Sequence, residues 1–326
     1  MSVKTKKTIG FLGLGTMGFP MCYGLSKAGF RMILPAYRRT VDQAAGYSPL
    51  AKDEAEKSAL IDEMLQNGAV AAASQKELLE QADIVMISMP TSRQVEALVL
   101  AEDGILANLR PGGIVIDLTS ADASSTRKLS AMLLEKGVEM LDAPISGGNV
   151  GATNQTRSVM IGGKEEVFQT CREIFDTIGD PQKVTYVGPS GAGDIIKSAN
   201  NYLSSMCLIA STEAIAVAAK AGIDPHVAAR VISQSGGCSQ AVTYKYPKLV
   251  FPGKDMGMSV NLMLKDIRLF KEAACSMDVP AFLASQLYEV FHLPVAENKG
   301  NVDFVYLVEM YEKWSGVKLR GIDGEA

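Results

Sequence analysis

Short apolar runs alternate with longer segments of helical periodicity from residue 8 to residue 188. The runs are short enough to be buried strands, and the helical segments are long enough to return the chain to the same edge of a sheet. Strands are predicted at 8–12, 31–34, 69–72, 83–88, 114–118, 139–142, 158–161 and 184–187. Helices are predicted between them at 17–28, 53–67, 92–100, 123–136 and 165–178. This alternation is typical of repeated βαβ units on a parallel sheet.

The strand pattern stops after Gly188 and Pro189, and the remaining chain has only helical periodicity. Helices are predicted at 192–221, 225–234, 239–250, 261–277, 281–296 and 303–314. The first of these would be about 45 Å long at about 1.5 Å per residue, enough to cross between domains or subunits. Its mostly apolar surface needs a cover, so we expect a homodimer or a homotetramer.

Composition narrows the class of protein. Hydrophobic residues make up 47% of the 326 residues and charged residues 21%, as in soluble globular enzymes. The net charge of -4 gives no reason to expect nucleic acid or a membrane as partner. The 5 cysteines are widely spaced and odd in number, which favours reduced thiols and a cytoplasmic location. With only 2 histidines, a metal site rich in imidazole is not expected.

A glycine-rich loop follows the first predicted strand directly. The run GLGTMG places Gly13, Gly15 and Gly18 in a Gly-x-Gly-x-x-Gly pattern between a strand and a helix. In that context the backbone can approach a pyrophosphate that rests on the helix N-terminus. The loop is therefore expected to contact the cofactor through Gly13, Leu14, Gly15, Thr16, Met17 and Gly18. The predicted fold is an α/β Rossmann-type dinucleotide-binding domain at 1–188, followed by an all-α domain at 189–326 that serves substrate binding and dimerisation.

The end of the second predicted strand bears on the choice of cofactor. An acid that would bind the ribose 2′-OH of NAD is expected there, but Ala36 occupies the position. Arg38 and Arg39 offer guanidinium groups suited to a 2′-phosphate, with Thr40 as a further donor. The pattern favours NADP(H) over NAD(H), although the two arginines would also fit as ordinary loop charges.

The ends of two later strands are also candidate cofactor contacts. Ligands of open α/β sheets bind at the carboxyl ends of the strands, where Met89, Pro90 and Thr119 stand. We expect them to line the nicotinamide and its ribose. The alternative is that these segments only begin loops and cap helices, as Asp122 would do as an N-cap.

Lys197 and Asn201 stand four residues apart in the run GAGDIIKSANN and would share one helix face. A long apolar segment follows, so the lysine is expected to be partly desolvated. Desolvation disfavours the charged amine and suits it to proton transfer near neutral pH. An ordinary helix lysine beside an asparagine pair is the alternative.

Two further segments are candidates for substrate or cofactor binding. In DAPISGG, the Ser146 hydroxyl and the backbone N–H groups of Gly147 and Gly148 could hold a carboxylate, or the segment could be a simple turn. Lys265 could reach the cofactor or substrate while Asp266 fixes its position. An exposed helix pair is an equally natural interpretation.

Four motifs, GLGTMGFPM, DAPISGG, GAGDIIKSANN and MLKDI, occur in this order over almost the whole chain, which therefore resembles the β-hydroxyacid dehydrogenases. The resemblance implies that Lys197 is the catalytic lysine, that Asn201 positions substrate and that Ser146, Gly147 and Gly148 bind its acid group. It also implies that Lys265 and Asp266 close over the cofactor. An extra charged segment near 42–65 departs from the family pattern, and its charges are typical of a solvated face.

The expected activity is oxidation of a small 3-hydroxy acid, or reduction of the matching semialdehyde, with Lys197 as general acid and base. One alternative is an imine reductase, against which Lys197 argues. The other is a non-catalytic nucleotide-binding protein on the same fold, which would not need the lysine.

Overall fold

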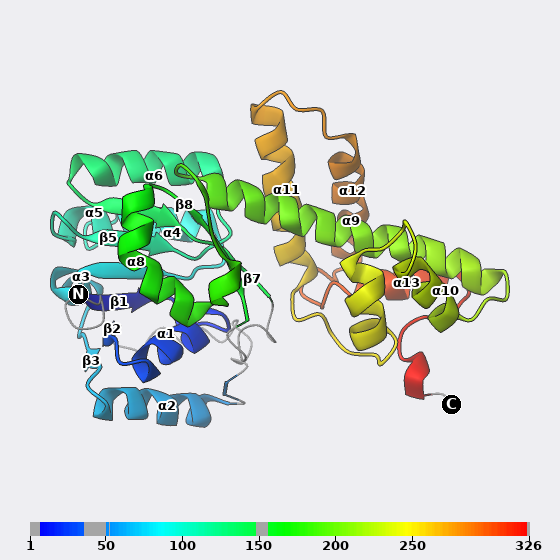
Figure 1. Ribbon diagram of the computed structural model, residues 1–326, viewed down its shortest axis with the longest axis horizontal. Coiled ribbons are helices and arrows are strands. Elements are labelled where there is room, and N and C mark those ends of the chain that lie inside the picture. The colour runs from blue at the N-terminus through cyan, green and yellow to red at the C-terminus, as the bar shows by residue number, and fades with distance from the viewer. Residues whose placement is uncertain (1–6, 36–49, 52, 148–155, 325–326) are drawn as a thin grey trace. The chain divides into compact units, whose positions relative to one another are not determined.

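The computed structural model describes residues 7–35, 50–51, 53–147 and 156–324 (Figure 1). Two compact units make up the chain, Met1–Lys197 and Ser198–Ala326. The sequence placed a boundary at 188/189, before helix α9 (Ala192–Lys220), whereas the units divide inside that helix. The difference arises because α9 is one continuous helix whose first turns belong to the N-terminal unit.

The N-terminal unit is built on a nine-stranded sheet. Its strands are β1 (Thr8–Leu12), β2 (Arg31–Leu34), β3 (Val70–Ala71), β4 (Ile84–Ile87), β5 (Ile114–Asp117), β6 (Glu139–Asp142), β7 (Ile145–Ser146), β8 (Ser158–Gly162) and β9 (Val184–Gly188). The order is β3-β2-β1-β4-β5-β6-β8-β7, with β9 paired to β8. Pairing is parallel from β3 to β6, so the carboxyl ends of those strands lie at one edge.

Helices cover both faces of this sheet (Figure 1). Their bounds are α1 (Gly18–Lys27), α2 (Glu54–Gln66), α3 (Gln75–Gln81), α4 (Ser92–Leu100), α5 (Ile105–Asn108), α6 (Ala123–Glu135) and α8 (Glu165–Ile178). Helix α1 contacts α2 and α8, while α4 contacts α5 and α6. Asp122 does cap α6, because its carboxylate accepts from the Ser124 N–H at 2.8 Å.

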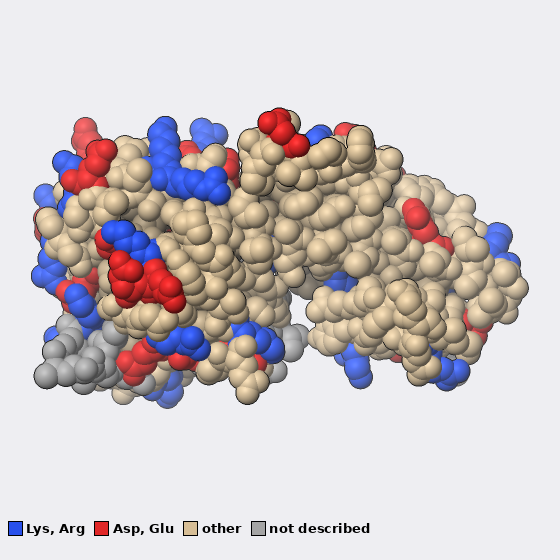
Figure 2. Space-filling model, turned by 45° about the horizontal axis from the view of Figure 1, so that its top comes forward, with Lys and Arg blue, Asp and Glu red and all other residues tan. Residues whose placement is uncertain are grey.

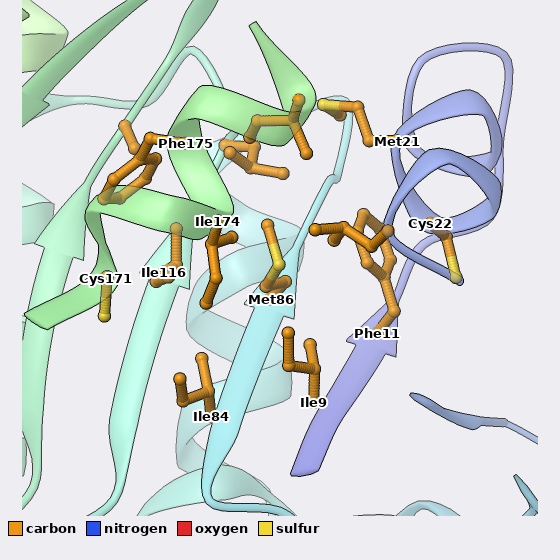
Figure 3. Packing of buried hydrophobic residues seen from close by; sticks show 14 of the residues in the cluster. Ile9, Phe11, Met21, Cys22, Ile84, Met86, Ile116, Cys171, Ile174 and Phe175 are labelled. Carbon is orange, nitrogen blue, oxygen red and sulfur yellow. The ribbon is translucent and has the colours of Figure 1, made fainter. Parts of the chain in front are cut away.

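Two hydrophobic clusters lie on the opposite faces of the sheet, as the alternation of side chains along a strand requires. Ile9 and Phe11 of β1 belong to one cluster, together with Phe175 of α8 (Figure 3). Leu12 of β1 belongs to the other, with Leu78 of α3. The strands are thus buried on both faces, which explains why they read as apolar runs in the sequence.

The C-terminal unit is helical, as the sequence predicted. Beyond α9 it contains α10 (Pro225–Ser233), the π-helical segment η4 (Ala241–Val250), α11 (Val260–Ser276), α12 (Phe282–Ala296) and α13 (Tyr306–Ser315). A core of buried side chains joins these helices, including Ile215 of α9, Tyr246 of η4 and Phe291 of α12. The predicted α/β fold followed by an all-α unit is confirmed.

The sheet differs from the predicted purely parallel one at the end of β6. The segment after β6 forms the short strand β7, in which Ser146 pairs antiparallel with Ser158 of β8. The sequence suggested a carboxylate-binding loop here, with a simple turn as the alternative, because two residues are too few to show a strand period.

Helix α9 is the single helix among the described residues that is long and apolar enough to cross a membrane, judged by length and composition alone. A core helix of a soluble protein passes the same test.

Candidate active site

The glycine-rich loop is a tight turn from β1 into α1. Gly13 has a φ of 95°, in the left-handed region that favours glycine, and a Cβ there would collide with the backbone oxygen of Ser88. A Cβ at Gly18 would collide with the Gly13 oxygen. Both glycines are therefore required for strand and helix to pack this closely. The loop leaves a surface at the N-terminus of α1 that suits a pyrophosphate.

The strand ends beside this loop are joined by hydrogen bonds. The backbone N–H of Met89, just after β4, donates to the Thr119 Oγ1, just after β5, at 3.1 Å. Thr119 in turn donates its N–H to the Asp117 carboxylate at 2.9 Å. The structure thus brings together Met89 and Thr119, two of the predicted nicotinamide contacts, at the edge that carries the glycine loop.

Two buried carboxylates fix the start of α9 to the same edge. Asp142, the last residue of β6, accepts the N–H of Gly191 at 2.7 Å and that of Asp194 at 3.2 Å. Asp194 accepts the N–H of Ala121 at 3.1 Å and the hydroxyl of Thr126 at 2.7 Å. The helix that carries Lys197 is therefore held by the ends of β5 and β6.

The electrostatics of this attachment are unusual. Both carboxyls are almost completely buried, with 1% exposure for Asp142 and 2% for Asp194. Burial, followed by the nearby charges of Asp142 and Asp117, raises the pKa of Asp194 well above its usual range. The attachment thus disfavours the charged form of Asp194 relative to an exposed carboxyl group.

Lys197 lies three residues beyond Asp194, close to one helical turn away, and only 8% of it is exposed. The predicted shielding of this lysine from solvent is therefore present. Ser146 lies on β7, directly after β6, and Gly147 follows it with a φ of 141°. Both positions follow the strand whose last residue, Asp142, also holds the start of α9.

The C-terminal unit holds Asn201, Lys265 and Asp266 together through a hydrogen bond and an ion pair. The Asn201 Nδ2 donates to Asp266 at 2.5 Å, and the Asn201 Oδ1 accepts from Asn200 at 3.1 Å. Lys265 forms an ion pair with Asp266 at 3.0 Å. Asp266 has 1% exposure. The expectation that Asp266 orients Lys265 agrees with this geometry, and Asp266 also orients Asn201, which the sequence did not reveal.

Several predicted contacts lie outside the described residues, namely Arg38, Arg39 and Gly148. The roles of the other site residues, including Leu14, Gly15, Thr16, Met17 and Pro90, remain predictions. The residues that sequence reasoning missed are Asp142 and Asp194. Each could have been found as an acidic residue among mostly apolar neighbours. Asp142 ends the strand sequence EMLD, and Asp194 lies in GAGDII at the start of a helix.

The described residues fit a dinucleotide. The turn at Gly13 has no room for a side chain, and the N-terminus of α1 offers backbone donors for phosphate. Thr119 and Met89 stand at the adjacent strand ends, where open α/β sheets bind their ligands. Among the described residues, no group of three or more His, Cys, Asp or Glu side chains is arranged to hold a metal ion.

Comparison with known proteins agrees with this site. An NAD-dependent L-serine dehydrogenase of Pseudomonas aeruginosa is 31% identical over 320 residues, which cover 95% of this chain and 99% of the relative. The structure of a 3-hydroxyisobutyrate dehydrogenase from Mycobacterium tuberculosis with L-serine is 27% identical, with a TM-score of 0.78, over 93% of this chain and 98% of that one.

An imine reductase from Myxococcus stipitatus is 16% identical with a TM-score of 0.59, over 94% of this chain and 99% of that one. At such an identity the likeness shows the fold alone.

Fold and loop together define an NAD(P)-binding protein of the Rossmann class. Residues 8–188 match the family described as the NAD binding domain of 6-phosphogluconate dehydrogenase. Residues 191–311 match the family described as NAD-binding of NADP-dependent 3-hydroxyisobutyrate dehydrogenase. The chain belongs to the β-hydroxyacid dehydrogenase family, as its four motifs indicated.

Proposed function

We propose that this protein is an NAD(P)-dependent oxidoreductase that interconverts a small 3-hydroxy acid and the matching semialdehyde. The observation that carries the proposal is that the helix with Lys197 is attached near the ends of β5 and β6. Met89 and Thr119, two of the expected cofactor contacts, lie at the same edge of the sheet. L-serine, which is itself a 3-hydroxy acid, occurs in the names of both a curated relative and a solved structure. These names support the substrate class.

The bound nicotinamide would supply the hydride acceptor or donor. The amine of Lys197 would accept the proton of the substrate hydroxyl during oxidation and return it to the oxygen during reduction. Ser146, Gly147 and Gly148 would bind the acid group through a hydroxyl and backbone N–H groups. Asn201, held by Asp266, would orient the substrate.

A substrate panel tests the activity. Purified protein would be mixed with NADPH and glyoxylate, succinic semialdehyde, tartronate semialdehyde or methylmalonate semialdehyde, and separately with NADP⁺ or NAD⁺ and L-serine or 3-hydroxyisobutyrate. Loss or gain of nicotinamide absorbance is measured. Turnover with at least one acid substrate is expected. Turnover of cyclic imines alone would favour the imine reductase alternative, and no turnover with bound cofactor would favour a nucleotide-binding protein.

The role of Lys197 is tested by Lys197→Ala. Loss of a general acid and base should lower kcat by a factor of about 10² to 10⁴ while the dinucleotide still binds. Lys128→Ala, an exposed lysine on α6 of the same unit, is the matched control and should keep full activity. Full activity in Lys197→Ala would show that another group transfers the proton.

We further propose that NADP(H) is preferred over NAD(H). The support is the sequence after β2, where Ala36 replaces the expected acid and Arg38 and Arg39 follow. Replacing both arginines by alanine should weaken NADPH binding much more than NADH binding. Equal weakening of the two cofactors would contradict the preference.

Finally, we propose that the C-terminal unit forms a homodimer or a homotetramer. Large apolar side chains are exposed on α9, with 56% exposure for Leu203 and 70% for Val217, and on α12, with 79% for Phe282. The visible face of this unit carries few charged side chains (right-hand part of Figure 2). A second copy of the chain would cover these residues.

Val217→Glu should therefore lower the mass measured by light scattering after size exclusion, and Leu134→Glu on α6 serves as the control. A monomeric wild-type protein that sediments with lipid vesicles would instead assign the apolar face to a membrane.

A further inference from the structure

Helix α2 lies in the charged segment that the sequence assigned to a solvated face. The structure shows that one face of it contacts α1 instead (Figure 1). Glu63 of α2 accepts the Tyr23 hydroxyl at 2.9 Å and the Lys27 ammonium at 2.8 Å, both from α1. Ile61 and Met64 of α2 are buried in the same core cluster as the α1 side chains. Helix α2 is therefore packed into the N-terminal unit.

Lys57, in the first turns of α2, reaches the glycine-rich loop. Its Nζ donates to the backbone oxygen of Leu14 at 2.6 Å, and it lies 5.3 Å from the centroid of the Phe19 ring. Leu14 lies between Gly13 and Gly15, and Phe19 follows Gly18. Lys57 thus places a positive charge beside the glycine-rich turn, which the dinucleotide would approach.

The Lys57 ammonium is partly buried beside the glycine-rich loop. Burial lowers the pKa of Lys57, while the charge of Glu54 on the same helix opposes that change. A backbone oxygen and an aromatic face offset part of the desolvation cost of a cation, and a phosphate would offset more. The N-terminus of α1 already favours phosphate at this loop, so a cation beside it adds to the same field.

We propose that Lys57 is a cofactor-binding residue whose ammonium contacts a phosphate group of the dinucleotide. The proposal deepens the proposed function and rests on it, because it requires NAD(P) in the loop. The group that Lys57 contacts is a phosphate. It is either part of the pyrophosphate, which both cofactors have, or the 2′-phosphate, which only NADP(H) has. Helix α2 of the extra segment would then contribute to cofactor binding.

Binding of NADP⁺ and NAD⁺ to the whole protein, measured by titration calorimetry at two salt concentrations, tests the proposal. Lys57→Met should weaken binding by about tenfold, as expected for the loss of one charge-assisted hydrogen bond. It should also make the affinity less dependent on salt. Lys57→Arg keeps the charge and should retain most of the affinity. Lys76→Met, an exposed lysine on α3, is the control and should bind like the wild type.

The two cofactors distinguish the source of the phosphate. Weaker binding of NADP⁺ alone would assign the contact to the 2′-phosphate, and equal weakening of both cofactors would assign it to the pyrophosphate. Wild-type affinity for both cofactors in Lys57→Met would overturn the proposal. So would an equal loss in Lys57→Arg with unchanged salt dependence, since Lys57 would then only support the Leu14 carbonyl. If wild-type protein binds neither cofactor, the proposed function itself fails.

Discussion

Lys245 of η4 is a buried cation whose removal should stabilise the protein. Only 7% of the residue is exposed, and its ammonium donates to the Ser204 backbone oxygen at 2.8 Å and to the Ser204 Oγ at 2.7 Å. No carboxylate among the residues that the structure describes forms an ion pair with it. Burial lowers the pKa of Lys245 from 10.5 to about 8, with a smaller opposing effect from Cys207.

The size of the effect follows from this shift. At about 1.4 kcal/mol per pKa unit, the charged form of Lys245 is disfavoured in the folded state by about 3 kcal/mol. Between pH 8 and pH 10.5 the unfolded chain binds a proton that the folded chain does not, so wild-type stability from this group rises with pH in that window. Below pH 8 the full penalty is present.

Lys245→Met removes the charge and keeps an apolar stem of similar length. The variant loses the hydrogen bonds to Ser204, worth about 1 to 3 kcal/mol, so we expect a net gain near pH 7 of up to about 2 kcal/mol. Its advantage over the wild type should fall by about 3 kcal/mol as pH rises from 7 to 10.5.

Trp314, the single tryptophan, lies on α13 of the same unit, so its fluorescence during urea unfolding measures this effect. Lys248→Met is the matched control, because Lys248 lies on the same segment but is exposed. Its stability relative to the wild type should not change with pH. If the Lys245→Met curve ran parallel to that of the wild type from pH 7 to pH 10.5, the reasoning about a buried charge would be wrong.

Two further predictions concern the N-terminal unit. Because the pKa of Asp194 is raised in the folded state, stability is lost as pH rises above the unfolded value toward the folded one. Asp194→Asn should therefore gain stability relative to the wild type as pH rises above the unfolded value of 3.8, at up to about 1.4 kcal/mol per pH unit. Calorimetric melting curves of the two proteins that shift in parallel with pH would contradict this. Phe175→Ala should cost about 3 to 5 kcal/mol in denaturant unfolding, because Phe175 has 0% exposure, whereas Leu134→Ala, at 47% exposure, should cost less than about 1 kcal/mol.

Most of the fold could be predicted from the sequence, because its strands are buried on both faces and its longer helices show helical periodicity. The predicted strand at 8–12 matches β1, and that at 139–142 matches β6. Helices α3 and α5 were not predicted, because segments of 7 and 4 residues are too short for a helical period to show. Strand β7 was not predicted either, because its 2 residues are too few to show the alternation of a strand.

The candidate site could be predicted only in part. The glycine loop could be predicted because only glycine fits at Gly13 and Gly18, where any side chain would collide with backbone. Lys197 and Asn201 could be predicted as a pair because their spacing of four residues places them on one helix face. The link from Asn201 to Asp266 joins positions far apart in the chain, so no local pattern could reveal it.

Apart from Lys197, the buried charged residues could not be predicted from the sequence pattern. A charge in a helical segment is normally assigned to solvent, since burying it unpaired is costly. Here Lys57, Asp194 and Lys245 are partly or fully buried, and each is compensated by backbone: the oxygen of Leu14, the N–H of Ala121 and the oxygen of Ser204. Every residue carries such backbone groups, so the compensating partner leaves no residue-type signature. For Asp194, an acid within the mostly apolar run GAGDII is the trace that remains, whereas Lys57 stands among other charges in AKDEAEKSAL and leaves no such trace.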